Sequence, residues 1–204
     1  MTKYHHGNLP AELLAHAAEM AQEVDPGAIS LRELARRVGV SHSAPVHHFG
    51  TRQGLLTALA AAGFTSLCQA LDAQGGDIYE MGVAYVMWGL DHPGHYAVMW
   101  QPRLLDESQN ELRVARGRAW ELLAGAVPGN GDLAAKGDAA ANGDPGANGD
   151  PARNGGPAAA YAAFSLVHGL VSIWLNGALP LPPNPRAIAQ EVVQQLRFSG
   201  LRRH

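Results

Sequence analysis

Apolar residues recur at helical spacing along most of the chain, and the alternation typical of strands is almost absent. After Asn8, a candidate helix cap, they stand at i, i+3, i+4 and i+7 until Asp25-Pro26-Gly27 ends the pattern. The same spacing predicts further helices over residues 30–38, 41–49, 51–74, 78–91, around 96–100, and over 104–127, 158–179 and 184–201. We therefore expect an all-α protein.

The first three predicted helices are short and closely spaced. Ser30-Leu31-Arg32-Glu33 has the S-x-x-E spacing of a capping box, Gly39 supplies a permissive turn residue, and Ser41 can cap the next helix. A helix–Gly–Val–Ser–helix arrangement is typical of a helix-turn-helix. The pattern predicts a helix-turn-helix domain over 1–56, with its fourth helix continuing to about 74, and a helical-bundle domain over 57–204.

Residues 128–157 differ from the rest of the chain, because they hold a five-copy repeat of period six that runs from Asn130-Gly131-Asp132 to Asn154-Gly155-Gly156-Pro157. A hexapeptide β-helix would need an aliphatic residue at a fixed position of each repeat, and only Leu133 is large. Because the repeat has so few large apolar side chains to bury, burial cannot offset the conformational entropy that the chain would lose on ordering. The repeat predicts a flexible loop between two helices of the bundle.

Composition indicates a globular, cytoplasmic protein. Hydrophobic residues make up 47% of the 204 and charged residues 16%, enough for a sizeable core. Cys68 is the single cysteine, which excludes an internal disulfide and a cysteine-based metal cluster. We find no signal-like run at the start, and the longest apolar stretch, 158–167, contains Ser165 and is followed by His168, so no membrane segment is expected.

Charge is unevenly spread over the chain. The formal net charge is −3, and residues 1–56 balance five basic against five acidic groups. Four of those basic groups nevertheless lie between 32 and 52: Arg32, Arg36, Arg37 and Arg52. A local basic patch can therefore exist on a chain that is not basic overall.

Two stretches resemble the TetR family of bacterial regulators. The first is residues 30–49, SLRELARRVGVSHSAPVHHF, which the run from Thr51 to Leu56 extends. The second, residues 164–179, is similar to the C-terminal body of a TetR subgroup with a Trp-His-Gly element; Phe164 replaces the Trp, whereas His168 and Gly169 are kept. The resemblance implies a dimeric, ligand-responsive regulator, by family default a repressor, that binds a palindromic DNA operator.

The resemblance further implies that a helix at about Ser41–His48 lies in the major groove. Its polar tips can reach base edges or phosphates, and arginines can hold the backbone. Val46 replaces an aromatic residue by which the family contacts phosphate, and Pro45 removes one donor. A module that has lost DNA affinity therefore stays open as the alternative. The DNA-contacting residues expected are Arg36, Arg37, Ser41, His42, Ser43, His47, His48 and Arg52.

Large apolar residues of the second domain suggest two surfaces. A plain core is the default interpretation of such residues, but the family keeps an apolar effector cavity there, suited to a hydrophobic or aromatic small molecule. His168 fits either a ligand contact or a buried histidine bonded to a backbone carbonyl. The candidate pocket residues are Met81, Tyr85, Trp88, Met99, Trp100, Trp120, Phe164 and His168. The candidate dimer stripe is Leu170, Ile173, Trp174, Ile188, Val192, Val193 and Leu196.

Neither metal nor enzyme chemistry is indicated. His47 and His48 are adjacent and so point about 100° apart on a helix. His92 and His95 have no carboxylate pair at ligand spacing beside them, and His5-His6 is a terminal pair. Nucleophile-elbow, phosphate-loop and dinucleotide-binding motifs are all lacking. We expect no cofactor and no catalysis.

Overall fold

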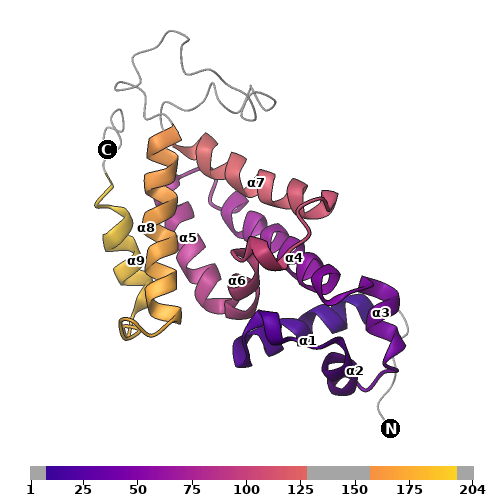
Figure 1. Ribbon diagram of the computed structural model, residues 1–204. Coiled ribbons are helices and arrows are strands. Elements are labelled where there is room, and N and C mark those ends of the chain that lie inside the picture. The colour runs from indigo at the N-terminus through magenta and orange to yellow at the C-terminus, as the bar shows by residue number, and fades with distance from the viewer. Residues whose placement is uncertain (1–7, 128–156, 197–204) are drawn as a thin grey trace. The chain divides into compact units, whose positions relative to one another are not determined.

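The computed structural model describes residues 8–127 and 157–196, and within them all regular structure is helical (Figure 1). This confirms the all-α prediction. The repeat over 128–156 and the end of the last predicted helix beyond 196 lie outside the described residues. The helices are α1 (Leu9–Glu23), α2 (Leu31–Val38), α3 (Ser43–Phe49), α4 (Arg52–Asp72), α5 (Ile78–Asp91), α6 (Pro93–Met99), α7 (Asn110–Ala126), α8 (Pro157–Leu175) and α9 (Pro185–Val193), with 3₁₀ turns η1 (Pro26–Ala28) and η2 (Pro102–Leu104).

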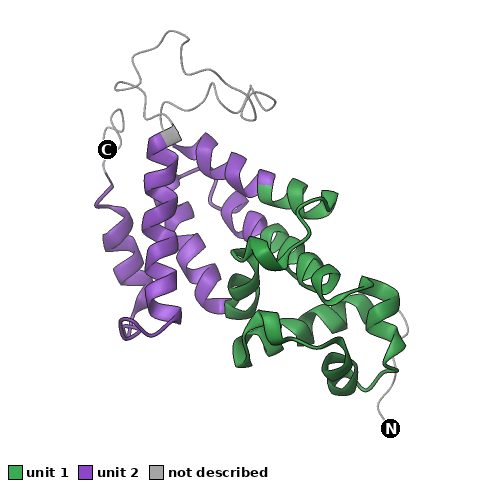
Figure 2. Ribbon diagram, in the orientation of Figure 1, with its two compact units in different colours: residues 1–66, 92–116 green, residues 67–91, 117–204 purple. Residues whose placement is uncertain are grey.

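By its internal contacts the chain forms two compact units (Figure 2). Unit 1 holds residues 1–66 and 92–116, and unit 2 holds 67–91 and 117–204. The helix-turn-helix therefore shares its unit with α6, η2 and the start of α7. This division into compact units differs from the domain boundary expected near residue 56, and the functional domains 1–56 and 57–204 stay a prediction.

Unit 1 is built around α1. Leu13 and Ala17 of α1 are fully buried, as are Leu34 of α2 and Leu55 of α4. Helix α6 packs along α1 through Gly94, where a Cβ atom would overlap the carbonyl oxygen of Ala18. A residue without a side chain is required there, because only it permits such a close approach of two backbones.

Unit 2 is a three-helix packing of α5, α8 and α9. Gly82 of α5 lets two valines come close: a Cβ at that position would stand 2.8 Å from Val193 Cγ1 and 3.4 Å from Val167 Cγ1. Beside it, Ile78, Val127 and Ala160 form a buried cluster that joins α5, α7 and α8.

Two predicted helix starts differ from the observed ones, and one predicted cap lacks its side-chain hydrogen bond. Helix α3 begins at Ser43 rather than Ser41, because the Ser41 hydroxyl meets the Ser43 hydroxyl at 3.0 Å instead of capping a backbone N–H. At the start of α1, Asn8 makes no side-chain cap hydrogen bond. Helix α7 begins at Asn110, six residues after the predicted start, because Pro102 opens the separate turn η2.

Two predicted helix ends also moved. Helix α8 stops at Leu175, before Gly177 in the left-handed region (φ 74°), and α9 stops at Val193. The capping box is half confirmed: Ser30 Oγ accepts from the backbone N–H of Glu33 at 3.5 Å. The Glu33 carboxylate does not return the bond, since it binds arginines instead.

Two helices are long and apolar enough to cross a membrane, contrary to the expectation that no stretch is: α4, and residues 158–175 of α8. Their mean hydropathies are 1.5 for α4 and 1.6 for α8. The polar residues Ser165 and His168 lower the average of α8 too little to take it out of this range. The apolar window of α4 is 61% buried within the protein, as in the core helix of a soluble domain. That of α8 is only 33% buried, which leaves an apolar helix largely uncovered.

Candidate nucleic-acid interface

Helix α3 presents a row of polar side chains to solvent. Ser41, His42, Ser43, His47 and His48 are all exposed, whereas Pro45 is buried against the rest of unit 1. Pro45 occupies the third position of the helix, where its missing N–H would lack an intrahelical partner in any case. Ser43, His47 and His48 lie in α3, and Ser41 and His42 directly precede it, so all five residues predicted to contact DNA from this segment are exposed. Val46 joins them with 49% of its area exposed.

Two glycines set the geometry around α3. Gly39 ends α2 with φ 76°, and Gly50 ends α3 with φ 68°, both in the left-handed region that residues with a Cβ rarely adopt. Helix α4 then begins with the Thr51 Oγ1 accepting from the backbone N–H of Gly54 at 3.0 Å. The two glycines and the Thr51 cap thus set where α2 and α3 end and where α4 begins.

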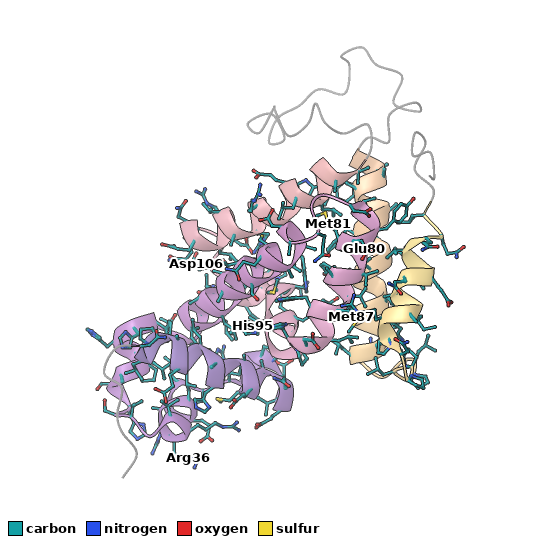
Figure 3. All side chains as sticks on the ribbon, turned by 180° about the vertical axis from the view of Figure 1, so that it is seen from behind. Arg36, Glu80, Met81, Met87, His95 and Asp106 are labelled. Atoms are coloured by element: carbon teal, nitrogen blue, oxygen red, sulfur yellow. The ribbon has the colours of Figure 1, made fainter. Side chains whose placement is uncertain are left out.

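Arg36 and Arg37 are engaged in ion pairs. Arg36, at the outer surface of α2 (Figure 3), donates to both oxygens of Glu33, at 2.8 and 2.6 Å. Arg37 donates to Glu23 of α1 at 2.9 Å and to Glu33 at 3.5 Å. The hydrogen bond from Arg36, assisted by Arg37, lowers the pKa of Glu33 from 4.5 to about 2, and Arg37 lowers the pKa of Glu23. Arg36 thus pairs within α2, and Arg37 links α2 to α1. Contact of either arginine with DNA stays a prediction.

Arg52, in the first turn of α4, donates a hydrogen bond from Nη1 to the carbonyl oxygen of Gly27 in η1. A guanidinium has five N–H donors, so this bond leaves most of them available. Arg52 therefore links the turn before α2 to α4 while remaining exposed.

Arg32 is a cation that the sequence-based set omitted. It is exposed in the first turn of α2 and makes no hydrogen bond or ion pair with the residues described. A positive charge at a helix start is unfavourable unless an anion meets it. The signal was present in the sequence: Arg36 and Arg37 reach Glu33 at i+3 and i+4, which leaves Arg32 without an acidic partner.

A polar and aromatic cluster lies inside unit 2. The Tyr85 hydroxyl is 3.0 Å from His168 Nδ1, and the Phe164 ring stacks on the His168 ring with centroids 5.0 Å apart. Tyr85 is 6% exposed, and burial lowers the pKa of His168, so the imidazole is neutral at neutral pH. His168 therefore bonds a tyrosine, which the two sequence-based alternatives did not foresee.

The other predicted pocket residues lie in different surroundings. Met81 and Trp88 are buried in unit 2, and Trp120 stands 38% exposed beside Tyr161, with ring centroids 5.0 Å apart. Met99 and Trp100 belong to unit 1: Met99 packs on Gly63, and Trp100 contacts the Phe64 and Tyr96 rings. Of the eight predicted pocket residues, Tyr85, Phe164 and His168 form a cluster with a polar centre.

Two members of the predicted dimer stripe are core residues. Trp174 is 8% exposed and Val193 is 4% exposed, with Val193 packed against α5 at Gly82, so neither can face a partner. The pattern misplaced them because α8 and α9 are apolar on more than one face. Leu170, Ile173, Ile188, Val192 and Leu196 are half-buried and remain candidates.

No group of three histidine, cysteine, aspartate or glutamate side chains that could hold a metal occurs among residues 8–127 and 157–196. The His92 and His95 rings lie 6.1 Å apart in unit 1, and burial together with the His92 charge lowers the pKa of His95. The His47 and His48 rings are 5.4 Å apart and tilted by 67°.

Comparisons with known proteins agree with this architecture. The family model "Bacterial regulatory proteins, tetR family" matches residues 13–59, and "Tetracyclin repressor-like, C-terminal domain" matches residues 78–196, more than half of the chain. A protein of unknown function from Rhodococcus sp. RHA1 is 30% identical, with a TM-score of 0.66 over 96% of this chain and 94% of that one.

Less similar structures share the fold. A tetR-family regulatory protein from Rhodococcus RHA1 is 22% identical, with a TM-score of 0.67 over 93% of this chain and 95% of that one. NalD of Pseudomonas aeruginosa, the secondary repressor of the MexAB-OprM multidrug efflux pump, is 20% identical, with a TM-score of 0.52 over 91% and 94%. Among proteins of curated function, no match is found. On its two family matches, this chain belongs to the TetR family of bacterial regulatory proteins and is a non-enzymatic, DNA-binding transcriptional regulator.

Proposed function

We propose that the protein is a ligand-responsive repressor that binds a palindromic operator as a homodimer in the cytoplasm. The observation that carries this proposal is the row of exposed polar side chains on and just before α3, a helix that lies between Gly39 at the end of α2 and the start of α4. Hydroxyl and imidazole tips at helical spacing suit hydrogen bonds to base edges in a major groove. A two-fold dimer would place its reading helices roughly one DNA turn apart. The repressor NalD, which shares the fold, gives a precedent for the sign of regulation.

The second copy is the partner we assign to the uncovered face of α8. Ala162 and Ser165 are exposed there, and a Cβ on Gly169 would meet no atom within 4 Å. A glycine inside a helix costs about 1 kcal/mol relative to alanine, and no atom of the described residues comes close enough to Gly169 to require its lack of a side chain. Close approach of an identical helix would use it, with half-buried Leu170 and Ile173 beside the contact.

The effector we propose is an apolar or aromatic small molecule with one hydrogen-bonding group. Phe164 and Tyr85 offer ring faces, and the neutral His168–Tyr85 pair offers the polar contact. Binding would weaken DNA affinity only if the effector binds the DNA-free state more tightly. A screen of such molecules for a rise in melting temperature tests this part, with His168→Phe expected to remove the response.

DNA binding is tested by a salt series on duplex DNA. We expect a steep negative slope of log affinity against log salt, since released counterions dominate such binding. Arg52→Ala should weaken binding to all sequences alike, whereas Ser43→Ala should change preference among operators. Affinity of the wild type that does not change with salt would support the alternative, a ligand-binding or protein-interaction module without DNA affinity. The pairing of Arg36 and Arg37 with carboxylates favours that alternative.

A further inference from the structure

Unit 1 carries an open groove of about 720 Å³ beside the helix-turn-helix. It lies where three elements meet: the start of α2, the start of α4 and the turn η2, which precedes α7 and lies outside the helix-turn-helix. Its polar lining consists of Ser30, Thr51, Arg52, Gln53 and Arg103. Apolar side chains, Ile29 and Leu56 among them, complete the wall.

The charge of this groove is entirely positive. Two arginines line it, and none of its lining residues is an aspartate or glutamate. Arg103 is exposed and, within the part of the chain that the structure describes, makes no hydrogen bond or ion pair. Arg52 uses one N–H group to donate a hydrogen bond to the carbonyl oxygen of Gly27, and its other N–H groups remain available. The groove therefore holds guanidinium donors that no group among residues 8–127 and 157–196 satisfies, which is the chemistry that binds a phosphate.

The backbone around Arg103 is held firmly rather than carried on a loose loop. Gln53 Nε2 donates to the carbonyl oxygen of Leu105 at 3.1 Å, and the backbone N–H of Asp106 (labelled in Figure 3) donates to Thr57 Oγ1 at 2.9 Å. Leu105 itself is 4% exposed. Because both anchors come from α4, the helix that carries Arg52, the two arginines are positioned by one element. Such pre-organisation reduces the entropy lost on binding.

The groove is continuous with the reading surface. Thr51 follows Gly50, which ends α3, and Ser30 caps α2, which precedes it. A duplex seated on α3 runs its backbone past the starts of the flanking helices, where free N–H groups also favour phosphate. We infer that this groove binds a phosphate of the bound DNA, and that Arg103, which lies outside the helix-turn-helix, contacts the DNA backbone there. The inference rests on the proposed binding of DNA through α3.

The test compares Arg103→Gln and Arg103→Lys with the matched control Arg113→Gln. Arg113 is also exposed and also in unit 1, and its loss changes the net charge equally, but it does not line the groove. Binding to a labelled duplex of mixed sequence is followed by fluorescence anisotropy across a salt series. Arg103→Gln should weaken binding roughly fivefold and lower the salt slope by about one, whereas Arg103→Lys and Arg113→Gln should stay near wild type.

Three outcomes would overturn the inference. In the first, Arg103→Gln binds like Arg113→Gln while the wild type binds well, so the DNA-binding function stands and only the contact fails. In the second, Arg103→Lys is as weak as Arg103→Gln and both melt at lower temperature, which indicates a structural role. In the third, inorganic phosphate raises the melting temperature through Arg103 while DNA binding ignores the substitution, which assigns the groove to a small anion. A wild type without any DNA affinity would remove the proposed function and this inference together.

Discussion

Glu33 lies at the centre of a charge cluster, because Arg36 and Arg37 both donate to its carboxylate. Arg37 also donates to Glu23 of α1. The cluster is exposed, so its main effect is on where charge is available rather than on overall stability. The charges of Arg36 and Arg37 are thus partly neutralised within the protein. Arg32 and Arg103 make no ion pair with the described residues and are available to an anion.

Glu33 predicts a pH dependence of stability. Its pKa is about 2 in the folded protein against 4.5 as the ordinary value, so folding favours the ionised form. The stabilisation is complete above about pH 4.5 and is lost as pH falls toward 2. Urea-unfolding midpoints of wild type and Glu33→Gln should therefore differ at neutral pH and converge between those two values. Glu111→Gln, which removes an exposed carboxylate without an arginine partner, is the control. A difference that persists at pH 2 would contradict the assignment.

Gly94 predicts a steric effect. In Gly94→Ala the new methyl group would overlap the carbonyl oxygen of Ala18, so α6 and α1 must separate. We expect a loss of about 1–3 kcal/mol in the free energy of unfolding, the usual cost of overpacking. Gly117→Ala, where the added carbon meets nothing within 4 Å, should instead gain about 0.5–1 kcal/mol through helix propensity. Equal stability of the two variants in urea unfolding would refute the close approach.

At the scale of elements, α8 stands apart from the other helices. It is strongly apolar, with a mean hydropathy of 1.6 over its 18-residue window, yet only 33% of that window is buried in the protomer. Its inner side, with Val167 and Val171, packs in unit 2, and its outer side carries small residues around Gly169. An uncovered apolar helix of this kind marks an interaction surface.

For α8 we predict that Gly169→Leu gives a folded monomer. The side chain has room within the protomer, because a Cβ at Gly169 meets no atom within 4 Å, but it would hold a second α8 away. Sedimentation velocity should show the change from dimer to monomer with an unchanged helical circular dichroism spectrum. Gly117→Leu places the same bulk at an open position of α7 and should stay dimeric. A dimeric Gly169→Leu protein would rule out α8 as the interface.

At the scale of the whole molecule, dimerisation and DNA affinity are predicted to be coupled. Two reading helices on one dimer make the second contact intramolecular, a gain of about 10²-fold or more in apparent affinity. Gly169→Leu should therefore lose that factor on an operator selected from random DNA, although α3 is untouched. Anisotropy titrations of the two glycine variants measure it. Undiminished affinity of a monomeric variant would contradict a bivalent mode of binding.

Features that depend on local forces could be predicted from the order of the residues alone. Helical periodicity predicted every helix described, and the permissive turn residue Gly39 predicted the end of α2. Helix propensity and turn conformation act over a few residues, so a short stretch carries their signal. The long ordered run from Ser30 to Phe49 was likewise sufficient to indicate the family.

Which residues are available to DNA or to a second protomer depends instead on contacts between distant segments. Arg37 is paired with Glu23, fourteen positions away on another helix, and Trp174 and Val193 are buried although their spacing matched an outward stripe. Arg103 comes beside Arg52 because Gln53 and Thr57 anchor the segment after η2 to α4. These placements depend on contacts between segments far apart in the chain, and helical spacing, which repeats every 3.6 residues, contains no information about them.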